Sequence, residues 1–97
     1  MKIVYDDTYI KIHSMKALIR SDYVDAYKAW REGYVTAEEY TEGCERLHKS
    51  QLEWIHTTFT SLDNGNEDGV IGVNVDMWAI GQLTEYADMV YRVFVTL

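Results

Sequence analysis

Apolar residues recur every three or four positions along most of this chain, which is the spacing of one face of an α-helix. The first such stripe predicts a helix over about 15–32, with Ser14 as its N-cap and Gly33 just past its end. Its apolar face consists of Met15, Ile19, Tyr23, Ala26, Tyr27 and Trp30.

A second helix is predicted over about 37–62, and its start carries the clearest signal in the sequence. Thr36 and Glu39 have the spacing of a capping box, in which each side chain accepts a hydrogen bond from the other residue's backbone N–H. Val35 and Tyr40 stand at the positions of a hydrophobic staple. The apolar stripe then runs through Tyr40, Cys44, Leu47, Ile55, Phe59 and Leu62.

A third helix is predicted over about 77–95, following Asp76. Its apolar face is made of Ile80, Leu83, Ala87, Val90, Tyr91 and Phe94. The closing segment, YRVFVTL, is rich in β-branched side chains and is also compatible with a strand. Helix is the preferred interpretation, because the stripe stays in phase as far as Phe94.

Short alternating segments at the start of the chain predict a β-hairpin. In KIVYDDTYIKI, residues 2–5 and 9–12 are expected to form strands around a turn at 6–8. A hairpin of this size needs a helix to pack against. The expected fold is mainly α, with a small N-terminal β-hairpin and three amphipathic helices in one compact bundle and a single domain, 1–97.

The segment AYKAWREGYVTAEEYTEGCERL, from Ala26 to Leu47, resembles the short helical hairpins of the SHOCT type. The shared pattern is a helix, a glycine, a start of the form apolar-Thr-x-Glu-Glu-aromatic, and a second helix. The resemblance covers about a quarter of the chain. It implies a helical hairpin with a role in interaction or assembly, and it constrains function little.

The composition is that of a globular protein: 97 residues, 47% hydrophobic and 26% charged, with a formal net charge of −7 at pH 7. The negative charge argues against direct contact with nucleic acid or an anionic membrane, and it permits a basic protein partner. The single cysteine, Cys44, cannot form an internal disulfide, and neither a signal-peptide core nor a membrane span is visible. A cytoplasmic protein is expected.

The stretch SLDNGNEDGVIG, residues 61–72, resembles the calcium loop of an EF-hand when Gly69 takes its sixth position. The candidate ligands in this register are Asn64, Asn66, Asp68 and the carbonyl of Val70. The twelfth position, however, holds Val75 in place of the bidentate glutamate of a calcium loop. A polar turn between two helices is therefore preferred over a metal site, and no cofactor is expected.

Glu-x-x-His occurs twice in the predicted second helix, as Glu45–His48 and Glu53–His56. Di-iron bundles place two such motifs on different, facing helices, whereas both lie on one helix here. Cys44 lies on the apolar stripe, where a buried and unreactive thiol is the default. These positions predict neither a metal centre nor a nucleophile, so an enzyme is not expected.

Four glutamates share the side of the second helix opposite its apolar face: Glu38, Glu42, Glu45 and Glu53. A row of carboxylates on a rigid helix can imitate phosphates and dock on a nucleic-acid-binding protein. The alternative is an ordinary solvated face, because Glu42–Arg46 and Glu45–Lys49 have the i,i+4 spacing of intrahelical ion pairs.

Two large side chains, Trp78 and Met89, fall away from the main stripe of the third helix. If exposed beside carboxylates they would suit a protein interface, and we group them with the four glutamates as candidate partner-binding residues. The alternative is that the N-terminal hairpin covers them.

Together these features predict a small acidic protein-binding module without enzymatic activity, whose partner is a basic nucleic-acid-binding protein. Its short length, acidity and missing catalytic motifs resemble small phage-encoded inhibitors of the anti-CRISPR or anti-restriction class, acting in the host cytoplasm. The alternative is a homo-oligomeric structural or assembly protein, such as a small phage virion component.

Overall fold

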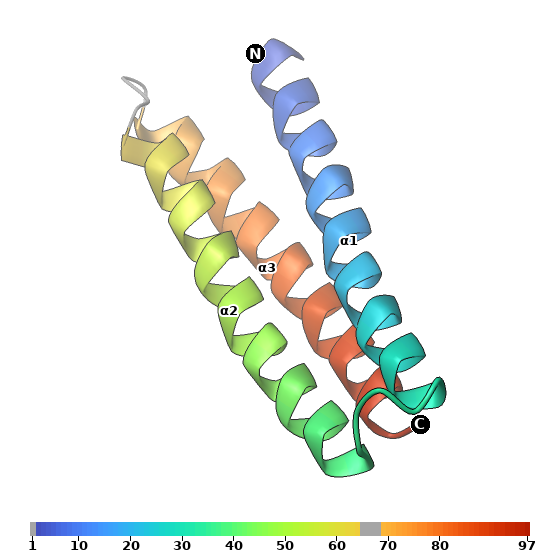
Figure 1. The fold of residues 1–97 in the computed structure, drawn as a ribbon. Helices are drawn as coiled ribbons and strands as arrows, with labels where there is room; N and C mark the ends of the chain where they lie inside the picture. The colour runs from blue at the N-terminus through green and yellow to red at the C-terminus, as the bar shows by residue number, and fades with distance from the viewer. Residues whose placement is uncertain (1, 65–68) are drawn as a thin grey trace.

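Three long helices make up the computed structural model, which describes the backbone of residues 2–64 and 69–97 and the side chains of residues 10–59 and 77–97. α1 spans Lys2–Arg31, α2 spans Ala37–Asn64 and α3 spans Gly69–Val95. Figure 1 shows the three helices running side by side, each antiparallel to the one before it in the chain. The bundle is a rod of about 50 × 19 × 17 Å, so most of its surface consists of long helix faces.

The predicted N-terminal β-hairpin is wrong. Residues 2–5 and 9–12, together with the predicted helix cap Ser14, all lie inside α1. Ile12 is buried and extends the stripe that begins at Met15 by one turn, so the segment gains a packed helical face. A short alternation of apolar and polar residues does not outweigh that packing, because β-propensity depends strongly on tertiary context.

The C-terminal segment is helical as far as Val95, as the phase of the stripe predicts. Val90 is buried and Phe94 packs against the core, and this packing overrides the β-branched composition. At its other end α3 begins at Gly69, well before the predicted boundary at 77.

The turn between α1 and α2 starts with the glycine cap that the sequence predicts. Gly33 has a φ of 85°. Its N–H donates to the carbonyl of Trp30 at 3.1 Å, and the N–H of Tyr34 donates to the carbonyl of Ala29 at 2.9 Å. This pair of bonds is a Schellman motif, which satisfies two of the last carbonyls of α1.

The capping box of α2 forms as predicted. The Thr36 N–H donates to Glu39 Oε1 at 2.9 Å, and the Glu39 N–H donates to Thr36 Oγ1 at 3.1 Å. Val35 and Tyr40, the predicted staple, both pack with the core. The start of α2 is therefore held both by its own backbone and by the rest of the bundle.

The core is one cluster to which all three helices contribute. Its buried apolar side chains are Ile12, Met15, Ile19, Tyr23, Tyr40, Cys44, Ile55, Phe59, Ala79, Leu83, Ala87 and Val90. The described members of the three predicted stripes are all buried or packed against this cluster. Hydrophobic periodicity thus identified which face of each helix points inward.

Aromatic rings fill the end of the bundle nearest the α1–α2 turn, and we call Tyr27, Trp30, Tyr40 and Phe94 the aromatic end. Trp30 stacks on Tyr40 with ring centroids 5.0 Å apart, and Tyr27 meets Phe94 edge-on at 5.9 Å. The Tyr40 hydroxyl donates a hydrogen bond to the backbone carbonyl of Phe94. These contacts fix the first turns of α2 against both α1 and the last turn of α3.

Candidate functional site on the outer face of the second helix

The four glutamates of the predicted acidic stripe, Glu38, Glu42, Glu45 and Glu53, are all exposed on α2. The opposite side of the same helix is buried through Tyr40, Cys44 and Ile55. Because the capping box and the aromatic end hold the start of α2, the first three carboxylates project from firmly positioned backbone.

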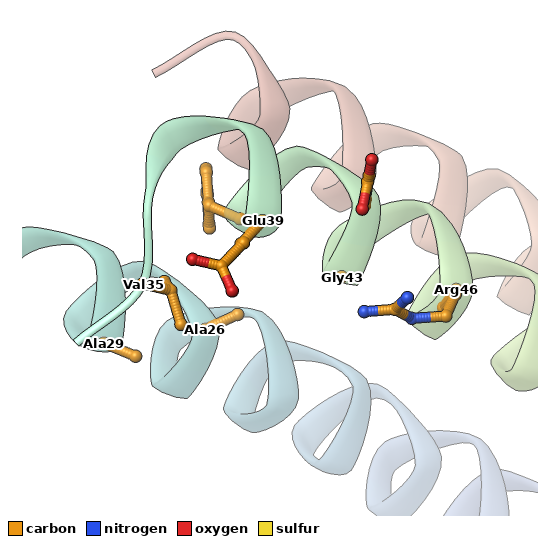
Figure 2. Close-up of a pocket in the computed structure, with 8 residues that line it drawn as sticks. Ala26, Ala29, Val35, Glu39, Gly43 and Arg46 are labelled. Carbon is orange, nitrogen blue, oxygen red and sulfur yellow. The ribbon is translucent and has the colours of Figure 1, made fainter.

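Intrahelical ion pairs do not neutralise this stripe. Among the described side chains, neither Glu42 with Arg46 nor Glu45 with Lys49 comes within ion-pair distance. Figure 2 shows the Arg46 side chain reaching toward Gly43. The carboxylates of Glu42 and Glu45 therefore remain available to a cation from outside the chain, which distinguishes them from an ordinary salt-bridged helix face.

Glu39, next to the stripe, has a different role. The hydrogen bond from the Thr36 backbone N–H, and after it the one with the Thr36 side chain, lowers the pKa of this carboxyl below its ordinary value. Its negative charge is used by the fold to close the start of α2.

A shallow groove of about 390 Å³ lies between the C-terminal part of α1 and the start of α2 (Figure 2). Its lining includes the small residues Ala26, Ala29 and Gly43 and the charged residues Glu42 and Arg46. A Cβ placed on Gly43 would meet no atom within 4 Å. The fold therefore makes no use of this glycine, although glycine inside a helix costs about 1 kcal/mol relative to alanine.

Trp78 and Met89 are exposed on α3, at 56% and 55% of their surface, and no hairpin covers them. The pair His48–Asp88 marks the antiparallel register of α2 and α3. In that register Met89 lies level with the middle of α2, whereas Trp78 lies about 30 Å along the rod from Glu38 at 1.5 Å per residue. The structure therefore does not gather the predicted partner-binding residues into one patch.

The candidate calcium loop falls largely outside the described residues. Asn66 and Asp68 are among those not described, while the backbone of Asn64 belongs to α2 and that of Val70 to α3. Within the side chains that the structure places, no three His, Cys, Asp or Glu residues are grouped as metal ligands.

The two Glu-x-x-His motifs do not form a common centre. His48 Nε2 lies 3.0 Å from Asp88 Oδ1, and its ring stacks on Tyr91 with centroids 4.5 Å apart. His56 is exposed to solvent on the same helix. His48 therefore links α2 to α3, which explains its presence without a metal.

Cys44 is fully buried among the apolar residues of α2. Burial raises the pKa of its thiol above the ordinary value, and a hydrogen bond with Tyr40 offsets this only in part. A thiol held in its protonated form and closed off from solvent is a poor nucleophile.

A buried polar group in the middle of the bundle was missed by sequence reasoning. We call Tyr23, His48 and Gln51 the polar middle. Gln51 is 5% exposed, and its Nε2 donates to Asp22 Oδ2 on α1 at 3.1 Å. The Tyr23 hydroxyl, His48 Nδ1 and Gln51 Oε1 are buried without a hydrogen-bond partner among the described residues. Gln51 lies one turn after Leu47 and one before Ile55, so its place on the apolar stripe was the available signal.

Burial also raises the pKa of the Tyr23 hydroxyl, and the nearby Cys44, Tyr91, Asp22 and Asp88 add to the shift in that order. The hydroxyl therefore stays protonated, and it is a donor placed among acidic groups. The incompletely paired atoms of the polar middle come from α1 and α2.

Comparison of the chain with protein-family models, curated proteins and solved structures finds no match in any of the three. None of the helices, as far as they are described, has the length and apolarity to cross a membrane. The function is therefore inferred from the geometry of the surface.

Proposed function

We propose that this chain is a small acidic protein-binding module that docks on a basic surface of a nucleic-acid-binding protein. The observation that carries the proposal is the row of exposed glutamates on α2, whose in-register cations make no ion pair with them. The net charge of −7 strengthens the field around that row.

A rigid row of carboxylates suits this task for two physical reasons. Its backbone needs no ordering on binding, because the capping box already fixes the start of α2. It also presents negative charge along a line, as a nucleic-acid backbone does, and so competes for the same Lys and Arg side chains. In its sharpest form the module is a phage or mobile-element inhibitor that blocks a host enzyme of the CRISPR or restriction type.

The first test is affinity capture with the tagged chain from bacterial lysate, with and without nuclease, followed by mass spectrometry. We expect one stoichiometric nucleic-acid-binding protein that remains bound after nuclease treatment, with an affinity that falls as salt rises. Capture that disappears with nuclease would show an indirect association through nucleic acid and would refute the proposal.

The second test reverses the charge of the stripe with the triple variant E38K/E42K/E45K. We expect a loss of affinity of about tenfold or more. The melting temperature should fall only modestly, because the carboxylates have no ion-pair partner within the described chain and only Glu38 lies in the first turn of α2, where the helix dipole favours an anion. The matched control, D25K/E32K/E85K, makes the same charge change at other exposed positions. Equal losses in both variants would show that only net charge matters.

A second candidate function, homo-oligomeric assembly, is favoured by the outer face of α3. Trp78, Met89 and Val93 share this face and are all more than half exposed. Large apolar side chains on one helix face are typical of contacts between subunits. Under this alternative, Trp78→Ala or Met89→Ala shifts the molar mass measured by light scattering, and a monomer that persists at high concentration would exclude it.

A further inference from the structure

The groove at Gly43 leads onto a longer boundary between α1 and α2. The hydrogen bond from Gln51 to Asp22 ties the two helices together along this boundary. Leu18 lies one turn beyond Asp22 on α1, and Trp54 lies one turn beyond Gln51 on α2. Because the helices are antiparallel, both lie at the same level, and they are 54% and 37% exposed. The boundary therefore has a small-residue groove at one end and two accessible apolar side chains at the other.

Gly43 indicates what approaches this groove. Its missing Cβ leaves open space and serves no contact within the chain, and glycine weakens the interior of a helix. Ala26 and Ala29 line the same groove from α1. These three residues are partly buried, and small residues lining a groove between two helices leave room for the backbone of a third helix to come close.

The charges around the groove select the kind of helix. Glu39 and Glu42 line it and Glu38 is exposed nearby on α2, whereas Arg46 is the one cation among its lining residues. The surroundings are therefore net negative, and a basic segment is complementary to them. An amphipathic helix combines an apolar face for the groove with Lys or Arg side chains for its edges.

We propose that the α1–α2 groove binds a basic amphipathic helix of the partner protein. Its apolar face lies over Ala29 and Gly43 and extends toward Trp54, and its cations contact Glu42. This inference rests on the proposed function, since it names the segment of the basic partner that the acidic module recognises.

The test uses a synthetic helical peptide with Leu and Ala on one face and Lys and Arg on the other. Its binding to the ¹⁵N-labelled chain is followed by NMR, and the shifted amides are expected at Ala29, Gly43 and Trp54. A scrambled peptide of the same composition has the same charge without an apolar face, and we expect it to bind about tenfold more weakly.

The decisive variant is Gly43→Leu, which fills the groove. Since a Cβ meets no atom there, the substitution raises Tm by about 4–8 °C through helix propensity and weakens peptide binding about tenfold. Gly81→Leu on α3 is the matched control, because Gly81 also has open space at its Cβ position. It raises Tm similarly and leaves peptide binding unchanged.

Three results would overturn the groove proposal: no binding of the amphipathic peptide, equal binding of the scrambled peptide, or full binding by Gly43→Leu. The proposed function and the groove proposal can be refuted independently of each other. If E38K/E42K/E45K abolishes capture of the cellular partner and Gly43→Leu does not, the acidic stripe is the docking surface and the groove is not. If Gly43→Leu weakens peptide binding and the charge reversal leaves capture unchanged, the groove binds an apolar helix face, and both the acidic stripe and the contact with Glu42 are refuted.

Discussion

The aromatic end and the polar middle each place a tyrosine hydroxyl in the interior of the bundle, and they treat it differently. Tyr40 donates its hydroxyl to the carbonyl of Phe94, whereas the Tyr23 hydroxyl has no partner within the described chain. An unmade buried hydrogen bond costs about 1–3 kcal/mol. The same residue type therefore stabilises one region and weakens the other.

This difference bears on the proposed docking surface. The groove at Gly43 and the first three glutamates of the stripe lie beside the aromatic end, where caps and ring contacts fix the backbone. A surface that must match a partner loses less entropy on binding when it is rigid beforehand. The Gly43 end of the candidate site therefore lies beside the region whose buried hydroxyl is hydrogen-bonded.

The largest loss of stability is expected from Phe94→Ala, which removes one ring from the aromatic end. The substitution removes ring contacts to Tyr23 and Tyr27 and should lower the free energy of unfolding by about 3 kcal/mol. Val93→Ala is the control, because this neighbour is 52% exposed and should cost less than about 0.5 kcal/mol. Urea denaturation measures both, and similar losses would show that the aromatic end does not anchor the bundle.

The aromatic end and the polar middle differ most directly in their response to loss of a tyrosine hydroxyl, which Tyr40→Phe removes from one and Tyr23→Phe from the other. Removing the Tyr40 hydroxyl breaks its bond to Phe94 and should destabilise by about 1 kcal/mol. Removing the Tyr23 hydroxyl deletes a buried group without a partner and should be neutral or stabilising by about 1 kcal/mol. Chemical denaturation of the two variants decides, and destabilisation by Tyr23→Phe would mean that its hydroxyl is satisfied in solution.

Replacing Gln51 in the polar middle with leucine should raise the free energy of unfolding by about 1 kcal/mol. The change removes the buried Oε1 that has no partner, and exposed Asp22 can turn to water instead. Asp22→Ala breaks the same hydrogen bond from the other side and should destabilise, because it strands the buried Gln51 amide. Thermal melts that move in the same direction for both variants would contradict this account.

A loss of about 1 kcal/mol is also expected at the start of α2 from Thr36→Ala, which removes the side-chain half of the capping box. Ser14→Ala makes a similar chemical change at an exposed position inside α1 and should not destabilise. Thermal melts compare the two, and equal losses would indicate that the box contributes little.

The weakest expected effect is a dependence on pH through Glu39. Hydrogen bonds from Thr36 lower its pKa in the folded state, so its contribution is complete above the ordinary value of 4.5 and is lost as pH falls through the lower folded value. Between those two values wild type should lose slightly more stability than Glu39→Gln. If acid titration lowers the stability of the two proteins by the same amount, the expectation is contradicted.

Much of the fold could be predicted, because it depends on interactions between neighbours in sequence. The capping box at Thr36, the cap at Gly33 and the inward faces of the helices all follow from local spacing. The hairpin prediction failed because residues 2–12 alternate too briefly to distinguish a strand from a helix. Among the described side chains, the burial of Ile12 one turn before Met15 favours the helix.

The candidate site, like the fold, was predictable from the sequence only in part. The exposure of the four glutamates on α2 followed from helical geometry. The groove at Gly43 was not predictable, since it requires the pairing of α1 with α2 that brings Ala29 beside it. The separation of about 30 Å between Trp78 and Glu38 was not predictable either, because it depends on the antiparallel register of α2 and α3.

The sequence by itself determined the elements: which residues are helical over most of the chain, where α2 starts, and which face of each helix is acidic or apolar. These features depend on hydrogen bonds and side-chain spacing within a few residues. The tertiary structure alone decided which buried polar atoms find partners, where the two helices leave a groove, and how far the acidic stripe lies from the exposed apolar face of α3. Those outcomes depend on contacts between residues distant in the chain, such as Asp22 with Gln51 and Tyr40 with Phe94.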